Sequence, residues 1–259
     1  MTTQQPQTYA EEAESCAELP ADTAERFADT AERFAGYAVL GMPFSSGFYL
    51  AFRHFPASSI GPGYRAVWLR RPDGQWVVYA DVPPHLSCAR YFGSALNAAI
   101  SAEITVSWNS PGIATIRIPD ILDWRIEMAG SRTSSVVSAL AQRIPARLWR
   151  NERVLRSMGL VAGPLLHAGK MKFSGVVPNG QSFQAQPLRV WIVRSTTATI
   201  DGADAGRPGP LPQQEHLGDF WLPQRGLFVA GLGVRFPSTA TAGTGAVQLS
   251  VCETEERAS

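Results

Sequence analysis

The stretch YRAVWLR-RPDG-QWVVYAD, residues 64–81, decides the fold class. Two runs in it, Tyr64–Arg70 and residues 75–81, are rich in the aromatic and β-branched side chains that favour strands. The four residues between them, Arg71–Gly74, place a proline and a glycine where a tight turn accepts them. The stretch therefore predicts an antiparallel β-hairpin.

Further short runs of the same kind continue along the chain, and one helical insert interrupts them. The insert is expected from about residue 134 to residue 158, with a break at Pro145. Strands at such short spacing predict an all-β, mainly antiparallel barrel or two-sheet sandwich. In fold class the pattern resembles lipocalin-like proteins, whose strands enclose an apolar ligand. The runs are residues 47–54, 102–108, 113–118, 123–128, 170–177, 188–194, 197–200, 226–236 and 246–252.

The charges divide the chain into acidic ends and a basic body. Residues 1–35 carry eight acidic and two basic side chains, and residues 253–259 carry three acidic and one basic. Residues 36–252 carry 20 basic and 11 acidic side chains, and we expect them to form a single large β domain. Within the acidic start, residues 21–34 repeat the heptad ADTAERF, which places Phe27 and Phe34 on one stripe of an expected amphipathic helix.

Composition excludes several classes of protein. Apolar residues make up 45% of the 259 residues and charged residues 17%, so the chain is not disordered. No apolar run approaches the ~20 residues of a membrane span, and the start lacks a signal sequence, so we expect a cytoplasmic protein. The three cysteines, Cys16, Cys88 and Cys252, form no CxxC pair, so neither a disulfide framework nor a zinc site is expected.

Tryptophans on the expected strands suggest a ligand cavity. In residues 123–128, apolar side chains alternate with charged ones, as in a strand with one buried face. A β-barrel wide enough to hold a ligand would be lined by such large side chains, although a solid aromatic core is nearly as good an explanation. The candidate ligand-binding tryptophans are Trp68, Trp76, Trp108, Trp124 and Trp191.

Known catalytic motifs are missing. The sequence holds no GxSxG, GxGxxG, GxxxxGK[ST], HExxH or CxxC pattern, so we expect neither a metal nor a cofactor. A carboxyl group in an apolar pocket has a raised pKa that suits proton transfer. On that argument the candidate catalytic residues are Asp219, in the stretch HLGDFW, and the pair Tyr79 and Asp81, with His167 as a further candidate. Asp219 and the pair Tyr79 and Asp81 are equally explained as turn-capping or strand-end residues, and His167 follows an apolar run that ends at Leu166.

Lys170 and Lys172 are the two lysines of the chain, and they lie two residues apart on an expected strand. A lysine beside another cation can lose its proton and act as a Schiff-base nucleophile. Met171 and Phe173 alternate with them, however, and form the more apolar face. We therefore expect both lysines to point into water.

Arginines recur every third residue at Arg147, Arg150, Arg153 and Arg156, which predicts a basic stripe on a helix. Arg150 and Arg153 are the candidate anion-binding residues of this stripe. It is explained either as an ordinary solvated face or as a docking site for a phosphate or an acidic carrier protein. The basic residues elsewhere are scattered and form no nucleic-acid-binding motif, so no nucleic-acid partner is expected.

These observations lead to one hypothesis and two rivals. The hypothesis is a β protein that binds an apolar small molecule in an aromatic-lined cavity and catalyses its hydration, isomerisation or cyclisation without a cofactor. The first rival is a non-catalytic carrier of the same ligand. The second rival is an interaction module that docks an acidic partner on the arginine stripe.

Overall fold

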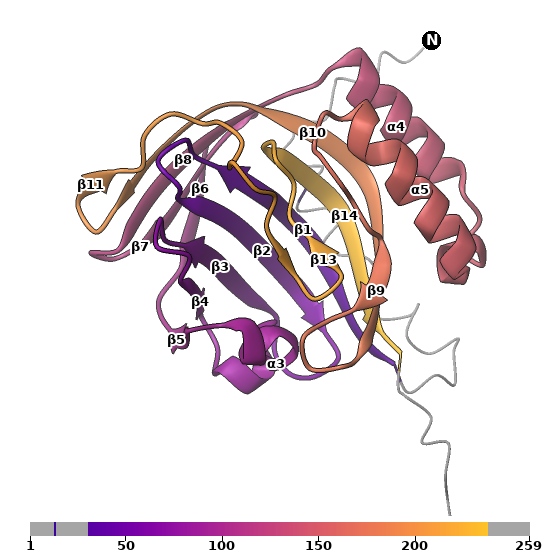
Figure 1. Cartoon of the computed structure of the whole chain (residues 1–259), viewed down its shortest axis with the longest axis horizontal. Coiled ribbons are helices and arrows are strands. Elements are labelled where there is room, and N and C mark those ends of the chain that lie inside the picture. The colour runs from indigo at the N-terminus through magenta and orange to yellow at the C-terminus, as the bar shows by residue number, and fades with distance from the viewer. Residues whose placement is uncertain (1–12, 14–30, 238–259) are drawn as a thin grey trace, which may run out of the picture.

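A computed structural model describes Ala13 and residues 31–237, and it shows a curled, mainly antiparallel sheet that forms a half-barrel (Figure 1). Neighbouring strands pair antiparallel, except for the parallel pair β4 and β5. The expected all-β fold class is therefore confirmed. The order of strands across the sheet is β5 (Ala98–Ser101), β4 (Trp76–Ala80), β3 (Tyr64–Arg70), β2 (Tyr49–Ser58), β1 (Glu32–Pro43), β14 (Leu227–Phe236), β10 (Ser182–Ile200), β8 (Leu122–Ala129), β7 (Ile113–Ile118) and β6 (Thr105–Ser110).

Short elements complete the sheet and cover it. β9 (Ser174–Val176) and β11 (Ala203–Asp204) pair with β10, while β12 (His216–Leu217) and β13 (Phe220–Trp221) form a separate hairpin. The helical segments are η1 (Pro84–Leu86), α3 (Ala89–Phe92), η2 (Gly93–Ala95), α4 (Arg132–Arg143), η3 (Leu148–Arg150) and α5 (Glu152–Leu165). Among the described residues, no helix has the length and apolar character needed to cross a membrane.

The helical insert forms in the predicted region and breaks near Pro145 as predicted, but it ends at Leu165 instead of near residue 158. α4 begins after Ser131, whose hydroxyl accepts a hydrogen bond from the Ser134 backbone N–H in a capping box. It ends before Pro145, and α5 begins after Asn151, whose side chain caps the next backbone N–H groups. Figure 1 shows α4 and α5 on the outer side of β10, and α4 packs against that strand.

The sheet buries both of its faces in the region of β1 to β4. On one face, which we call the helix-side face, Tyr49, Trp68 and Val78 belong to one hydrophobic core with side chains of α3, α5 and β13. On the other face, the inner face, Phe52 and Val67 meet side chains of β7, β8 and the end of β10, because the sheet curls over on itself. Strands in this region are therefore apolar on both sides.

β10 is one strand of 19 residues where the sequence predicts two. Its first half pairs with β14, from Gln184 to Ile192, and its second half pairs with β8, from Ile192 to Ile200. A register shift between Val193 and Ser195 marks the bend between the two halves. The polar residues around this bend are the reason that the sequence pattern breaks there.

β1 contains irregularities that the sequence analysis does not predict. Its register against β2 shifts between Val39 and Met42, and its register against β14 shifts between Val39 and Gly41. A side chain at Gly41 would collide with the ring of Tyr49, which crosses β1 at this point. The Tyr49 hydroxyl then donates a hydrogen bond of 2.8 Å to the Pro223 carbonyl.

The N-terminal expectations need correction where β1 begins. β1 starts at Glu32, so the end of the second ADTAERF copy is strand rather than helix, and the expected domain boundary at residue 35 falls inside β1. Phe34 is buried on the helix-side face instead of lying on a helical stripe with Phe27. Phe27, most of the acidic start, the strand expected at 246–252 and the end at 253–259 lie outside the described residues.

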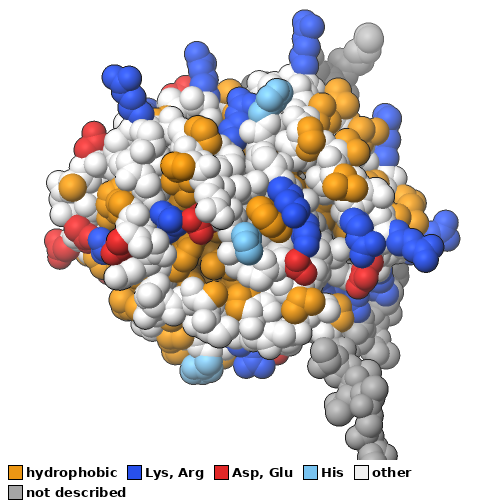
Figure 2. Space-filling view, viewed as in Figure 1, with side chains coloured by type: hydrophobic (Ala, Val, Ile, Leu, Met, Phe, Trp, Pro, Cys, Tyr) orange, Lys and Arg blue, Asp and Glu red, His pale blue; other side chains and the backbone are white. Residues whose placement is uncertain are grey.

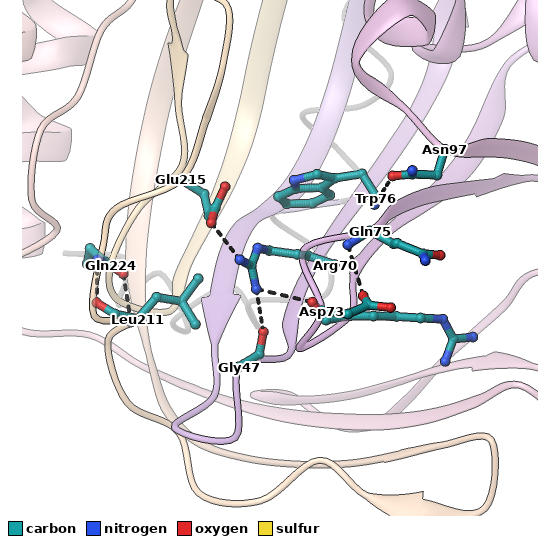
Figure 3. Close-up of polar contacts among 10 residues, drawn as sticks. Gly47, Arg70, Asp73, Gln75, Trp76, Asn97, Leu211, Glu215 and Gln224 are labelled. Atoms are coloured by element: carbon teal, nitrogen blue, oxygen red, sulfur yellow. Dashed lines mark hydrogen bonds and ion pairs between the residues drawn. The ribbon is translucent and has the colours of Figure 1, made fainter.

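The segment from residue 205 to residue 226, which contains β12 and β13, is fixed to the sheet by polar contacts (Figure 3). The Arg70 guanidinium forms an ion pair of 2.8 Å with Glu215 and donates to the Gly47 carbonyl at 2.9 Å. Leu211 and Gln224 exchange two hydrogen bonds across the segment. These contacts hold Phe220 in place over the helix-side face.

Candidate functional site

Arg53 is a buried cation on the helix-side face. It lies on β2 between Ala51 and Phe55, which face the same side, and 4% of its surface is exposed. Its Nη1 donates to the carbonyls of Val39 (2.6 Å) and Phe52 (2.9 Å), and its Nη2 donates to that of Leu40 (3.3 Å). Leu40 falls in the register shift of β1 and has no partner in either neighbouring strand, so its carbonyl accepts from the guanidinium instead.

No described carboxylate forms an ion pair with Arg53. Its neighbours are aromatic rings, with the guanidinium carbon 5.3 Å from the Trp68 ring centroid and 6.0 Å from that of Phe220. Burial lowers the pKa of Arg53 from its ordinary value, because desolvation disfavours the charged form. A buried charge without a counter-charge is costly, so this arrangement favours any anion that can reach it.

The guanidinium keeps part of its hydrogen-bonding capacity. Arginine has five N–H groups in a rigid planar fork. Hydrogen bonds to described residues use three of those on Arg53, two on Nη1 and one on Nη2. The Nε–H and one Nη2–H form no hydrogen bond with a described residue, and the atoms Nε and Nη2 lie on one edge of the plane. Such an edge matches the two oxygens of a carboxylate.

Arg53 faces a cavity of about 50 Å³ whose walls are mostly aromatic. That volume holds a few water molecules or a group the size of a carboxylate. Phe55 and Trp68 come from strands, Phe92 from α3, Phe183 from β10 and Phe220 from β13. The cavity is thus assembled from segments that are far apart in the sequence.

Apart from Arg53, the polar groups in the cavity wall are neutral hydrogen-bond donors and acceptors. Trp68 Nε1 donates to the Cys88 sulfur at 3.0 Å, and the Tyr64 hydroxyl and the Cys88 thiol are hydrogen-bonded to each other. Burial raises the pKa of Cys88 to about 11 and raises that of Tyr64 well above its ordinary value. Both groups therefore keep their protons at neutral pH, and Cys88 is not a thiolate nucleophile.

Tyr91 closes the cavity beside an ion pair. Its hydroxyl donates to a Glu32 carboxylate oxygen at 2.7 Å, while Arg90 binds the other oxygen at 2.9 Å. Its ring stacks on that of Phe236 with centroids 3.7 Å apart. Burial, followed by the hydrogen bond to Glu32, raises the pKa of Tyr91. Glu32 is thus engaged by two partners and does not neutralise Arg53.

A second cavity of about 380 Å³ lies on the same face, between α4, α5 and the strands β10 and β14. Its walls are aliphatic, with side chains such as Val137, Ala162 and Val190. Leu40 of β1 belongs to the walls of both cavities. The volume lies within the range of ~300–1,000 Å³ that is common for ligand pockets.

The five tryptophans predicted to bind a ligand lie on different faces of the sheet. Trp68 lines the aromatic cavity, and Trp76 belongs to the same core without lining either cavity. Trp108, Trp124 and Trp191 belong to the inner face, on the other side of the sheet. Three of the five are thus separated from Arg53 by the sheet itself.

The four candidate catalytic residues do not come together. Tyr79 is buried on the inner face, and Asp81 follows β4 and forms an ion pair of 3.4 Å with Arg65. His167 is exposed just after α5, with a positive φ of 52° that marks the end of the helix. Asp219 lies in the turn between β12 and β13. None of them lines either cavity.

Asp219 has the opposite pKa shift from the one that a buried general acid needs. Its carboxylate forms an ion pair with Lys172 and accepts a hydrogen bond of 3.1 Å from the Val176 backbone N–H. These two contacts lower its pKa from the ordinary value. The expectation of a desolvated carboxyl with a raised pKa at this position is therefore wrong.

The lowered pKa of Asp219 gives a pH dependence. Because the folded-state pKa lies below the unfolded one, the ion pair contributes stability above the ordinary pKa of 3.8, and the contribution is lost as the pH falls through the lowered pKa. As the pH falls from about 5 to about 2, we expect the urea midpoint to decline less steeply in Asp219→Asn than in the wild-type protein. A parallel decline in both proteins would contradict this. Asp73→Asn, in the exposed β3–β4 turn, is the control.

The lysines are placed partly as expected. Met171 and Phe173 are buried, Lys170 is exposed with its ammonium 4.1 Å from the Trp221 ring centroid, and Lys172 is half-buried in its ion pair. Neither lysine lines either cavity, so the described part of the chain places no lysine amine there.

The arginine stripe is divided between two helical segments. Arg147 precedes η3 and Arg150 ends it, whereas Arg153 and Arg156 belong to α5, which begins after the cap at Asn151. The expected single helix is therefore wrong. Arg150 and Arg153 are both exposed, and the docking of an acidic partner on them stays a prediction.

The sequence analysis misses Arg53 itself. The signal is present in the stretch FYLAFRHF, because Arg53 falls on the same side of the strand as Tyr49, Ala51 and Phe55. A charged residue within such an apolar alternation indicates either a partner or a ligand.

Comparisons with known proteins identify no family. No protein-family model matches the sequence, and neither does any curated protein. Among solved structures, the chain is similar to an acetoacetate decarboxylase from Legionella pneumophila, with 10% sequence identity, a TM-score of 0.33 and coverage of 81% of this chain and 84% of that chain. It is also similar to a second acetoacetate decarboxylase structure, with 9% identity, a TM-score of 0.33 and coverage of 81% and 85%. Similarity at this level carries no argument about activity.

Proposed function

We propose that the protein binds an apolar small molecule that carries a carboxylate group. One observation carries the proposal: Arg53 is a buried cation at an aromatic cavity and has no carboxylate partner among the described residues. A ligand carboxylate would supply the missing negative charge and accept the two remaining N–H groups. The aromatic walls would pack against the apolar part of the ligand next to it.

Binding explains the cavity better than proton transfer does. The described residues that line it include no aspartate, glutamate or histidine. Tyr64 and Cys88 hold their protons at neutral pH, because burial raises both pKa values. Such groups orient a ligand but do not act as general bases near neutral pH. The non-catalytic carrier is therefore the form of the hypothesis that the geometry supports.

The test compares ligands that differ in charge alone. We expect hexanoate to bind the purified protein, and hexanamide to bind at least about tenfold more weakly, because the amide cannot neutralise a buried guanidinium. Isothermal titration calorimetry measures both affinities, and native mass spectrometry shows whether a copurified acid is already present. Equal affinity for acid and amide, or no binding of either by ligand-free protein, would refute the proposal.

A further inference from the structure

We infer that the ligand is amphipathic, with its carboxylate at Arg53 and an unbranched aliphatic tail in the cavity between α4, α5 and the sheet. The inference rests on the proposed function and specifies the class of its ligand as a medium- to long-chain aliphatic acid. It is carried by the position of the second cavity relative to the first, by its lining and by its open side.

The two cavities lie end to end along the same strands. Along β10, Phe183 and Ala185 line the aromatic cavity, and Pro187 and Val190 line the aliphatic one. β14 repeats this order, with Val234 and Leu232 followed by Val229 and Leu227.

Leu40 forms the common wall. Among the described residues it is the one that lines both cavities, and its backbone carbonyl accepts the hydrogen bond from Arg53 Nη2. A tail that runs from Arg53 into the second cavity would pass this half-buried side chain, which can turn aside by a change of rotamer. The guanidinium therefore lies next to the point where a tail would enter the second cavity.

The second cavity has the chemistry of a site for an aliphatic chain. Ser157 is the one residue with a polar side chain among the described residues that line it, and its hydroxyl already donates to the Arg153 carbonyl at 2.9 Å. Met171 and Phe173 close the end near β9. No charged side chain among the described residues lines this cavity, so we place the ligand's acidic group at Arg53.

The open side of this cavity exposes large apolar side chains. Leu140 of α4 is 57% exposed, and Val161 and Leu165 of α5 are 63% and 41% exposed, although all three line the cavity. Figure 2 shows exposed hydrophobic side chains among Lys and Arg side chains on the side where α4 and α5 lie in Figure 1. Apolar surface of this kind marks a binding site. A tail that starts at Arg53 is the occupant that uses both cavities at once.

A series of straight-chain acids tests the inference. The probes are the sodium salts of the acids from butanoate to tetradecanoate, each below its micelle concentration, with the matching amides as controls. We expect affinity to rise about fourfold for each added methylene, the equivalent of ~0.8 kcal/mol, until the cavity is full and then to level off. Affinity that does not change with chain length would overturn the inference.

Variants locate the tail. Ala162→Phe would fill the aliphatic cavity, so we expect it to weaken dodecanoate at least about tenfold while leaving butanoate unchanged. Val161→Gln changes an exposed lining residue and carries little risk to folding. We expect it to weaken the binding of dodecanoate too, but by a smaller factor. Leu160→Gln is the matched control, because Leu160 is 71% exposed on the same helix and does not line the cavity.

The outcomes separate this inference from the proposed function. If butanoate and hexanoate bind in preference to their amides but longer acids bind no better, the carboxylate site stands and the tail site is wrong. A different result is that longer acids bind better while Ala162→Phe and Val161→Gln bind dodecanoate as tightly as Leu160→Gln does. In that case the tail lies elsewhere and the inference is overturned. If no acid is preferred to its amide, the proposed function fails first.

Discussion

Replacing Arg53 with glutamine is expected to remove the preference for an acid over its amide. The wild-type guanidinium is buried and forms no ion pair with a described carboxylate, so a ligand carboxylate gains its full charge interaction there. Losing one partner of such a buried pair costs about 2 kcal/mol or more, which is roughly a 30-fold loss of affinity. Calorimetry with hexanoate and hexanamide measures the change, and the amide's affinity should stay within about threefold of its wild-type value.

The folding cost of this variant needs a separate measurement. Arg53 also satisfies the carbonyls of Val39 and Leu40, so Arg53→Gln leaves acceptors without donors and should lower the free energy of unfolding by about 1–3 kcal/mol. Urea unfolding determines that loss. Arg53→Lys is the matched control, because it keeps the charge without the planar fork. Its affinity for hexanoate should lie between that of the wild-type protein and that of Arg53→Gln. If folded Arg53→Gln bound hexanoate as tightly as the wild-type protein does, Arg53 would not be the residue that binds the carboxylate.

Trp124→Ala is expected to destabilise the protein strongly without changing ligand binding. Trp124 is fully buried on the inner face, and its Nε1 donates to the Thr196 hydroxyl at 2.8 Å. Removing a buried tryptophan leaves a large void and costs about 3–5 kcal/mol. The measurement is urea unfolding, with hexanoate affinity determined on the folded fraction. We expect that affinity to be unchanged, because the sheet separates Trp124 from Arg53.

Two further variants control for this result. Trp124→Phe keeps most of the volume and should cost clearly less than Trp124→Ala. Trp68→Leu, on the helix-side face, should instead weaken the binding of hexanoate, because Trp68 lines the aromatic cavity and lies against Arg53. A loss of affinity in folded Trp124→Ala as large as that in Trp68→Leu would mean that both tryptophans contact the ligand.

Local pattern is enough to predict the strands that are buried on one side or joined by a tight turn. β3 and β7 have the predicted bounds, and β8 extends the predicted run by one residue at each end. β1 is not predicted, because both of its faces are buried and its register shifts twice, so no simple alternation survives. The start of β1 also continues a heptad repeat that favours a helix when it is considered alone.

The candidate site could not be predicted in the same way, because it depends on long-range contacts. Arg53 comes from β2, its carbonyl acceptors include two from β1, and Phe183 and Phe220 reach the cavity from more than a hundred residues away in the sequence. The alternation around residue 53 predicts which face Arg53 takes. It does not predict that no described carboxylate pairs with it, because that depends on every segment packed nearby.

The length of β10 sets how the protein should unfold. One half of this strand belongs to the pairing with β14, and the other half belongs to the pairing with β8. If either part of the half-barrel opened, the other would be left with a long unpaired sheet edge and an exposed apolar surface. The two parts therefore stabilise each other cooperatively, and we expect a single denaturation transition in which the amide hydrogens of β14 and β8 exchange with solvent at the same slow rate.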